Sequence, residues 1–252
     1  GIGGSDAATE LAQLQDMSAG AEPIGDAEFA ARLQRAQQLM QAAGLDALYL
    51  NAGTNLLYFT GTRWSPSERM VGALIPAQGE PRYIAPAFEL GTLQGFLRVA
   101  GEVHCWEEHE SPYRLCAQLL KDMHVTTLGV DESAPFFIVD GLQQAAPQCR
   151  VQSATPITAG CRMQKSAAEL ALMQRAKDMT LEVHRAVARI LRPGITTGEV
   201  TAFIHEAHKR VGAPAGSYFC IVLFGPDSAF PHGVAQPKAL DAGDMVLIDT
   251  GC

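Results

Sequence analysis

Two residues near the carboxyl end of the sequence have types and spacing suited to hydrolytic chemistry. Asp249 follows the apolar run Met245–Ile248, and His232 lies 17 residues before Asp249, between a proline and a glycine. An ionised carboxylate beside apolar residues is costly unless a positive charge compensates it, and a metal ion is one such charge. A histidine presented by a Pro/Gly loop can donate a hydrogen bond to a substrate carbonyl or oxyanion. We therefore interpret Asp249 as a candidate metal ligand and His232 as a candidate catalytic and substrate-binding residue.

Both residues also have ordinary explanations. An aspartate at the end of a strand often caps a turn, and Gly251 follows Asp249 closely enough for such a turn. The alternative for His232 is an ordinary loop histidine without a chemical role. The local pattern therefore leaves both interpretations open.

Other groups of potential metal ligands fit known sites less well. The histidines of His205-Glu-Ala-His208 are three positions apart, whereas two zinc ligands on one helix face need a spacing of four. His104, Cys105 and His109 lie in an acidic stretch typical of a solvated edge. None of the six cysteines forms a CxxC pair, which argues against a structural zinc site.

Two polar and aromatic segments follow strand patterns in the first half of the chain. These are Trp64–Arg69 and Pro86–Glu89. The simpler interpretation is loop packing with a local Glu–Arg pair. The alternative is a lip over a substrate site, in which Trp64 and Arg69 would contact the substrate.

Composition excludes several classes of protein. The chain has 252 residues, of which 47% are hydrophobic and 18% charged, with a formal charge of −8 and no basic stripe. These values are typical of a globular protein and disfavour binding to nucleic acid or to an anionic membrane. No apolar run approaches the ~20 residues of a membrane span. Unpaired cysteines favour a cytoplasmic location, and export with a removed signal remains the alternative.

The first two thirds of the sequence alternate between helix and strand patterns. Apolar residues recur at helical spacing over 26–43, and Gly44 ends that helix. This alternation favours an α/β domain with a mixed sheet over 26–160, preceded by a loosely held leader over 1–25. The predicted strands are 46–52, 70–76, 81–85, 103–106, 127–130 and 150–152, a further short apolar stretch is 56–60, and the predicted helices between them are 90–99, 112–123 and 136–145.

The last third has a different organisation. Ser166 and Glu169 form a capping-box pattern that begins a long helix, and Thr196 and Glu199 repeat this pattern for a second helix. Two strands follow, over 219–224 and 245–249. Two helices and two strands are too few to close a core, so we assign 161–252 to an incomplete α+β domain.

Several motifs in this last third resemble the pita-bread metallopeptidases of the Xaa-Pro aminopeptidase and Xaa-Pro dipeptidase (prolidase) family. The first part resembles the creatinase/prolidase N-terminal domain. Together the resembling segments extend over about 25–252. They are 46–48, 55–61, 67–69, 86–89, 163–173, 191–200, 224–233 and 243–251.

The resemblance implies a binuclear site in which two Asp, one His and two Glu hold two divalent cations, manganese or zinc. Asp249 corresponds to the first of these ligands, and His232 to the histidine that assists at the scissile carbonyl. The implied reaction is hydrolysis of the bond before proline in Xaa-Pro dipeptides or short peptides by a metal-bridged hydroxide. The resemblance also implies a homodimer or higher oligomer, in which the N-terminal domain narrows the entrance to the substrate site. Trp64 and Arg69 are the candidate residues at that entrance.

The four remaining ligands would lie beyond Cys252. We therefore expect residues 1–252 alone to be inactive, and the active protein to be longer or to associate with a complementary fragment. Two alternatives share the architecture. One is a creatinase-like amidinohydrolase, which needs no metal, and the other is a non-catalytic homologue that binds proteins.

Overall fold

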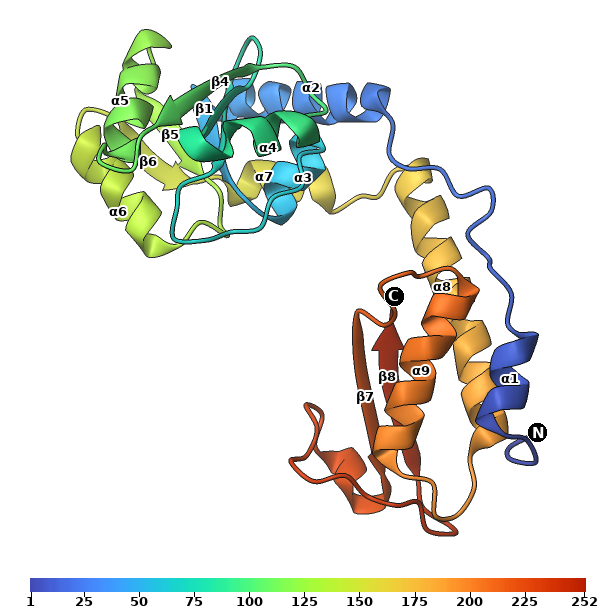
Figure 1. Cartoon of the computed structure of the whole chain (residues 1–252). Coiled ribbons are helices and arrows are strands. Elements are labelled where there is room, and N and C mark those ends of the chain that lie inside the picture. Colours follow the sequence, from blue (N-terminus) through green and yellow to red (C-terminus); the bar gives the residue numbers. More distant parts are fainter. The chain divides into compact units, whose positions relative to one another are not determined.

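The computed structural model describes residues 1–252, which form two compact units (Figure 1). The α/β unit comprises residues 24–165. The C-terminal unit comprises residues 166–252 together with residues 1–23. The chain therefore divides at Lys165–Ser166, whereas the sequence patterns placed the division at 160–161. No helix is long and apolar enough to cross a membrane.

The α/β unit is built on a six-stranded sheet with the order β4-β3-β2-β1-β5-β6. Strand β1 pairs antiparallel with β2 and parallel with β5, so the predicted mixed sheet is confirmed. The strands are β1 (Ala47–Asn51), β2 (Gly72–Pro76), β3 (Arg82–Pro86), β4 (Glu102–Trp106), β5 (Thr127–Val130) and β6 (Arg150–Ser153).

Helices cover both faces of this sheet because β1 is apolar on both faces. Leu48 and Leu50 pack with one set of helices, and Ala47 and Tyr49 pack with the other. The first set is α2 (Asp26–Ala43), α3 (Thr54–Thr60), α4 (Leu90–Phe96) and α7 (Thr155–Arg162), with the short helix η1 (Ala87–Glu89) before α4. The second set is α5 (Pro112–Asp122) and α6 (Phe136–Ala145).

Most predicted elements of the α/β unit occur where the sequence places them. The helix over 26–43 ends at Gly44 in the left-handed conformation, with a φ of 68°. The apolar stretch 56–60, by contrast, belongs to helix α3, and α7 is an additional helix that periodicity did not indicate. Both are only two turns long, which is too short for a periodic pattern to identify them.

The C-terminal unit consists of two long helices packed on a two-stranded sheet. Helix α8 (Ala167–Ile190) and helix α9 (Thr197–Val211) both begin with the predicted capping boxes, in which the N-cap hydroxyl and the third-residue glutamate bond reciprocally. Strands β7 (Phe219–Phe224) and β8 (Val246–Gly251) pair antiparallel, and the short helix η2 (Gly225–Ala229) follows β7.

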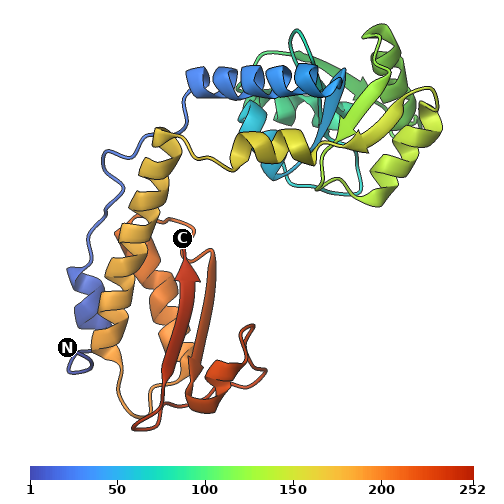
Figure 2. The same cartoon turned by 180° about the vertical axis from the view of Figure 1, so that it is seen from behind.

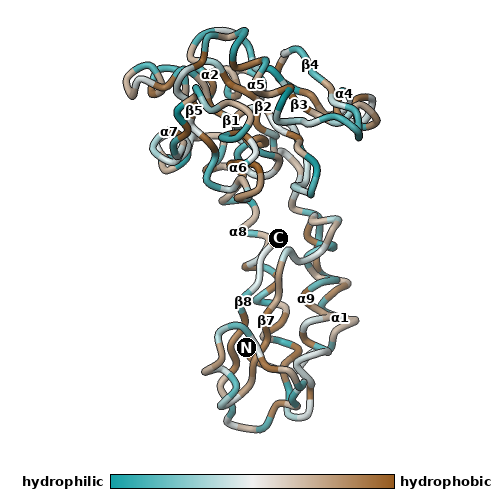
Figure 3. The backbone as a smooth tube through the Cα atoms, turned by 90° about the vertical axis from the view of Figure 1, so that its left-hand side faces the viewer, coloured by the Kyte–Doolittle hydropathy of each residue, from teal (hydrophilic) through white to brown (hydrophobic).

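The helices cover only one face of the β7–β8 sheet, as Figures 1 and 2 show from opposite sides. Val222 and Phe224 of β7 are buried in the core formed with α8 and α9, and Val246 and Ile248 of β8 pack against that core. Strand β7 is hydrophobic along its whole length (Figure 3). Because side chains alternate along a strand, the residues next to Val222 and Ile248 in the sequence lie on the opposite face of the sheet.

Residues 1–23 are not a loosely held leader, which corrects the expectation from their composition. Helix α1 (Ala7–Gln13) lies beside α8 and α9 (Figure 1), and Leu11, Leu14 and Met17 pack against their core. Glu10 is buried and accepts a hydrogen bond from Arg189 at 2.6 Å. Hydrogen bonding from Ser5 and Arg189 lowers the pKa of Glu10. Packing on α8 and α9 therefore orders a polar segment that has little apolar periodicity of its own.

We predict that Glu10→Gln destabilises the C-terminal unit by about 1–2 kcal/mol, because it removes the charge from a buried hydrogen-bonded pair. Hydrogen exchange of α9 peptides measures the effect. Both tryptophans belong to the α/β unit, so tryptophan fluorescence should not change. The matched control is Glu182→Gln, which breaks a surface pair with Arg185 and should cost less than about 0.5 kcal/mol. Equal protection in the two variants would contradict the prediction.

Candidate functional site

Asp249 lies within β8, on the face of the sheet that the helices leave uncovered. Its side chain is exposed, and the residues from Val246 to Ile248 are half-buried. The apolar run Met245–Ile248 suggests a buried strand, and this expectation is therefore corrected. The physical reason is that the helices cover one face of the sheet only, and Asp249 projects from the other face.

The pairing of β7 with β8 places Ile221 directly opposite Asp249. Directly opposed residues of an antiparallel pair project from the same face, with their Cβ atoms about 5 Å apart. The neighbouring pair on that face is Leu223 with Leu247. Asp249 is therefore an exposed carboxylate at the end of an apolar row, in which Leu223 is buried and Ile221 and Leu247 are half-buried.

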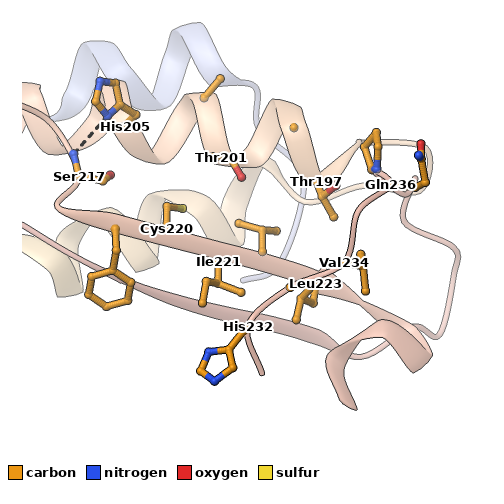
Figure 4. A pocket seen from close by; sticks show the side chains of 16 residues that line it. Thr197, Thr201, His205, Ser217, Cys220, Ile221, Leu223, His232, Val234 and Gln236 are labelled. Atoms are coloured by element: carbon orange, nitrogen blue, oxygen red, sulfur yellow. Dashed lines mark hydrogen bonds between the residues drawn. The ribbon is translucent and has the colours of Figure 1, made fainter. Parts of the chain in front are cut away.

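His232 lies in the loop between η2 and β8 and is exposed. It lines a groove of about 780 Å³ along β7, together with residues of α9. Figure 4 shows Thr197, Thr201 and His205 of α9 on one side of β7, and the loop that carries His232 and Gln236 crossing beside the strand. The groove also includes Ile221 but not Asp249. Ile221 therefore lines the same groove as His232 and lies directly opposite Asp249 on the sheet.

The surroundings of Asp249 suit a bound cation in one respect. Its carboxylate forms no ion pair and accepts no side-chain hydrogen bond within the chain, so both oxygens are available as hard ligands. No group of three His, Cys, Asp or Glu side chains in the chain could hold a metal ion. The chain therefore holds no complete metal site around Asp249.

Trp64 and Arg69 belong to the α/β unit, whereas His232 and Asp249 belong to the C-terminal unit. Trp64 packs edge-on against Phe96. Arg69 donates hydrogen bonds to Glu108 at 2.9 and 3.0 Å and pairs with Glu68 at 2.7 Å. The local Glu–Arg pair that the sequence suggested is therefore present, between Glu68 and Arg69. Glu108, which is distant in the sequence, binds the same guanidinium.

The structure also contains a buried histidine network that the sequence did not reveal. His208 is fully buried, with Nδ1 2.8 Å from Ser217 Oγ and Nε2 3.0 Å from Thr180 Oγ1. His205 Nδ1 accepts a hydrogen bond from the backbone N–H of Ser217 at 3.2 Å. These contacts attach the segment before β7 to both α8 and α9. The local signal was available, because His208 follows Ile204 at helical spacing, but only the fold supplies its partners.

We predict that acidification weakens the C-terminal unit through His208. Burial, and then the nearby His184 and His205, lower the pKa of His208 below its usual value of 6.5. The unfolded chain therefore binds one more proton in the window between the lowered pKa and 6.5, and stability falls as the pH drops through that window. Urea unfolding followed by far-UV circular dichroism between pH 5 and 7 measures this loss.

The His208→Gln variant should be less stable at pH 7 and should lack this part of the pH dependence. The control is His109→Gln, an exposed histidine of the α/β unit, which should keep the wild-type pH profile. A pH dependence that persists in His208→Gln would refute the assignment.

Two family descriptions match the chain, one in each unit. Residues 32–164 match the Creatinase/Prolidase N-terminal domain, and residues 171–252 match Metallopeptidase family M24. The protein named Probable dipeptidase PepE of Mycobacterium tuberculosis is 33% identical over 229 residues, which are 90% of this chain and 60% of that protein.

Solved structures give the same result for the fold. Dipeptidase PepE from Mycobacterium ulcerans matches with a TM-score of 0.79 and 31% identity, over 91% of this chain and 62% of that one. The prolidase from Thermococcus sibiricus matches with a TM-score of 0.78, over 91% and 62% of the two chains, and its 23% identity supports the fold alone. The chain spans about 60% of the length of these relatives.

Proposed function

Because the chain belongs to metallopeptidase family M24, in the branch that carries a creatinase/prolidase N-terminal domain, we propose that it serves metal-dependent hydrolysis of the Xaa-Pro bond. The substrates are Xaa-Pro dipeptides or short peptides with proline in the second position. One observation carries the proposal: an unpaired carboxylate, Asp249, lies on an open apolar face beside the groove that His232 lines.

Asp249 would hold a divalent cation, manganese or zinc, through its exposed carboxylate oxygens. When bound, two such cations supply Lewis acidity for activating water and polarising the scissile carbonyl. The directly opposed neighbour of Asp249 on the sheet is the apolar residue Ile221, which offers no charge to compete with a cation. The half-buried side chains of Ile221 and Leu247 offer an apolar surface for the proline ring of a substrate.

His232 would donate a hydrogen bond to the scissile carbonyl oxygen and to the oxyanion that develops from it. Its loop position leaves the imidazole free to reach a substrate in the groove. This role requires the donating nitrogen to carry a proton while the substrate is bound, which a neutral or a charged imidazole satisfies. His232 therefore acts on the substrate, and Asp249 acts on the cation.

Trp64 and Arg69 are proposed to narrow the entrance to the site in a homodimer or higher oligomer, where they would limit substrate length. The half-buried ring of Trp64 would pack against a substrate side chain, whereas Arg69 is already engaged by Glu108 and Glu68. We therefore assign the larger contribution to Trp64.

The first test is the substrate and metal dependence. The assay is carried out with the four remaining metal ligands supplied, because residues 1–252 alone are expected to be inactive. Protein that has been treated with a chelator should then hydrolyse an Xaa-Pro dipeptide only after manganese or zinc is restored, because the carboxylate site acts through the cation. A longer Xaa-Pro peptide is assayed in parallel: cleavage of the dipeptide alone selects a dipeptidase, and cleavage of both selects an aminopeptidase. Metal-independent hydrolysis of creatine would favour the amidinohydrolase, and no hydrolysis of any substrate would sink the proposal.

Asp249→Asn should reduce metal binding and activity together. A neutral amide is a weaker ligand for a divalent cation, so we expect activity to fall more than about 100-fold and the bound-metal stoichiometry to decrease. Plasma emission spectrometry of the dialysed protein measures the metal. Asp241→Asn, which changes an exposed turn residue nearby, is the control and should keep the wild-type metal content.

His232→Gln should lower kcat by about 100-fold while the metal content stays unchanged, because the loss of an oxyanion donor affects the transition state more than the cation. Steady-state kinetics on the Xaa-Pro dipeptide provide kcat and KM separately. A variant that loses metal in parallel with activity would show instead that His232 supports the metal site.

A further inference from the structure

The two units are connected by two separate stretches of the chain. The chain leaves the C-terminal unit after Pro23, passes through the whole α/β unit, and returns at Ser166. The α/β unit is thus inserted between residues 1–23 and helix α8. We call residues 1–23 the strap. The family matches begin at residue 32, so the strap lies outside both of them.

The strap is attached to the C-terminal unit along its length. The backbone N–H groups of Gly3 and Ser5 donate to carbonyl oxygens at the end of α8, at 2.8 and 3.1 Å. At the other end of the strap, the Met17 N–H donates to Val211 O of α9 at 2.8 Å, and Arg175 of α8 donates to Met17 O. The ion pair of Glu10 lies between these two attachments.

In the α/β unit, the two connections join helices α2 and α7, and both helices are bonded to Tyr58. The guanidinium of Arg32, in α2, lies 4.0 Å from the Tyr58 ring and donates to Tyr58 O at 2.8 Å. The Tyr58 hydroxyl donates to Cys161 O, near the end of α7, at 2.9 Å. Helices α2 and α7 also pack against each other. The start of α2 and the end of α7 are therefore held in one rigid unit.

The stretches of chain between these anchors are short. Residues 18–25 lie between the last strap attachment and α2, and almost all of them are exposed. As a flexible segment, these eight residues would have an end-to-end distance of roughly 16 Å. Residues 163–165 form the other connection, between α7 and the capping box of α8.

We propose that the strap is a second tether, which restricts the movement of the α/β unit relative to the C-terminal unit. Two short connections close a ring through both units, and a ring permits fewer relative orientations than a single flexible connection. The restriction holds only while the strap stays docked on α8 and α9. Docking of α1 therefore controls the freedom of a whole domain.

The test is to cut the tether without removing the strap. Residues 19–23 are replaced by the recognition sequence of a specific protease, and the cut and uncut forms of the same protein are compared by small-angle X-ray scattering. We expect cutting to raise the radius of gyration by about 10%, because one connection of three residues then remains. The strap should co-elute with the protein in buffer and separate from it in urea.

Two results would overturn the proposal: scattering that is identical before and after cutting, or release of the strap in buffer as soon as it is cut. The first result would mean that the strap does not restrict the movement of the α/β unit relative to the C-terminal unit. The second would mean that the strap docks on α8 and α9 too weakly to restrict that movement. Activity is not used in this test, so its outcome is independent of the proposed hydrolysis.

A matched pair of substitutions tests the role of docking in the uncut protein. Leu14→Asp places a charge on the packed side of the strap, and Ala12→Asp places the same charge on the exposed side of α1. We expect the scattering of Leu14→Asp to resemble that of the cut protein and Ala12→Asp to resemble the wild type. Hydrogen exchange of α9 verifies that the C-terminal unit is folded in both variants. Equal scattering of the two folded variants would contradict the proposal.

Discussion

The antiparallel register between β7 and β8 is the constraint on which the candidate site depends. It places Asp249 opposite Ile221 and leaves both on the open face, while Val222 and Ile248 face the helices. A slip of one residue would turn the Asp249 carboxylate into the apolar core and expose Ile248. Burial of an unpaired carboxylate is costly enough to exclude that register. The register of β8 against β7 therefore determines which of its side chains is available for chemistry.

The helices hold this register through the segment that enters β7. Ser217 bonds to both His205 and His208, and Gly216 lies beside the His205 ring. A Cβ atom at Gly216 would lie 2.3 Å from that ring, and its φ of 78° is unfavourable for any other residue. The start of β7 can thus approach α9 closely only because residue 216 is a glycine. The buried histidine network therefore holds the start of β7, and with it the register of the β7–β8 sheet.

The α/β unit shows a different use of buried polar groups. The Asp131 carboxylate, at the carboxyl end of β5, accepts hydrogen bonds from the Asn51 backbone, the Asn55 side chain and Ser133. These bonds tie α3 to the ends of two parallel strands. A fully bonded buried carboxylate of this kind stabilises the fold, whereas the Asp249 carboxylate is exposed and accepts no side-chain hydrogen bond. Hydrogen-bond partners, not residue type, distinguish the two aspartates.

The sequence by itself determined the long helices, the strands and the mixed α/β class of the first unit, and it singled out Asp249 and His232, whose roles stay predictions. These conclusions rest on local information: hydrophobic period, capping residues such as Ser166 and Thr196, and short motifs. The sequence could not identify α7 or the docking of residues 1–23, because short or polar segments gain their order from surfaces that distant residues provide.

Only the tertiary structure decided that Asp249 is exposed, that His208 is buried and that Arg69 is engaged by Glu108. Each of these properties depends on which residues the fold brings together. The helices cover only one face of the β7–β8 sheet, so the exposure of Asp249 follows from the packing of the helices on the sheet. Local order is encoded by neighbours along the chain, whereas the surroundings of a side chain are set by contacts between segments far apart in it.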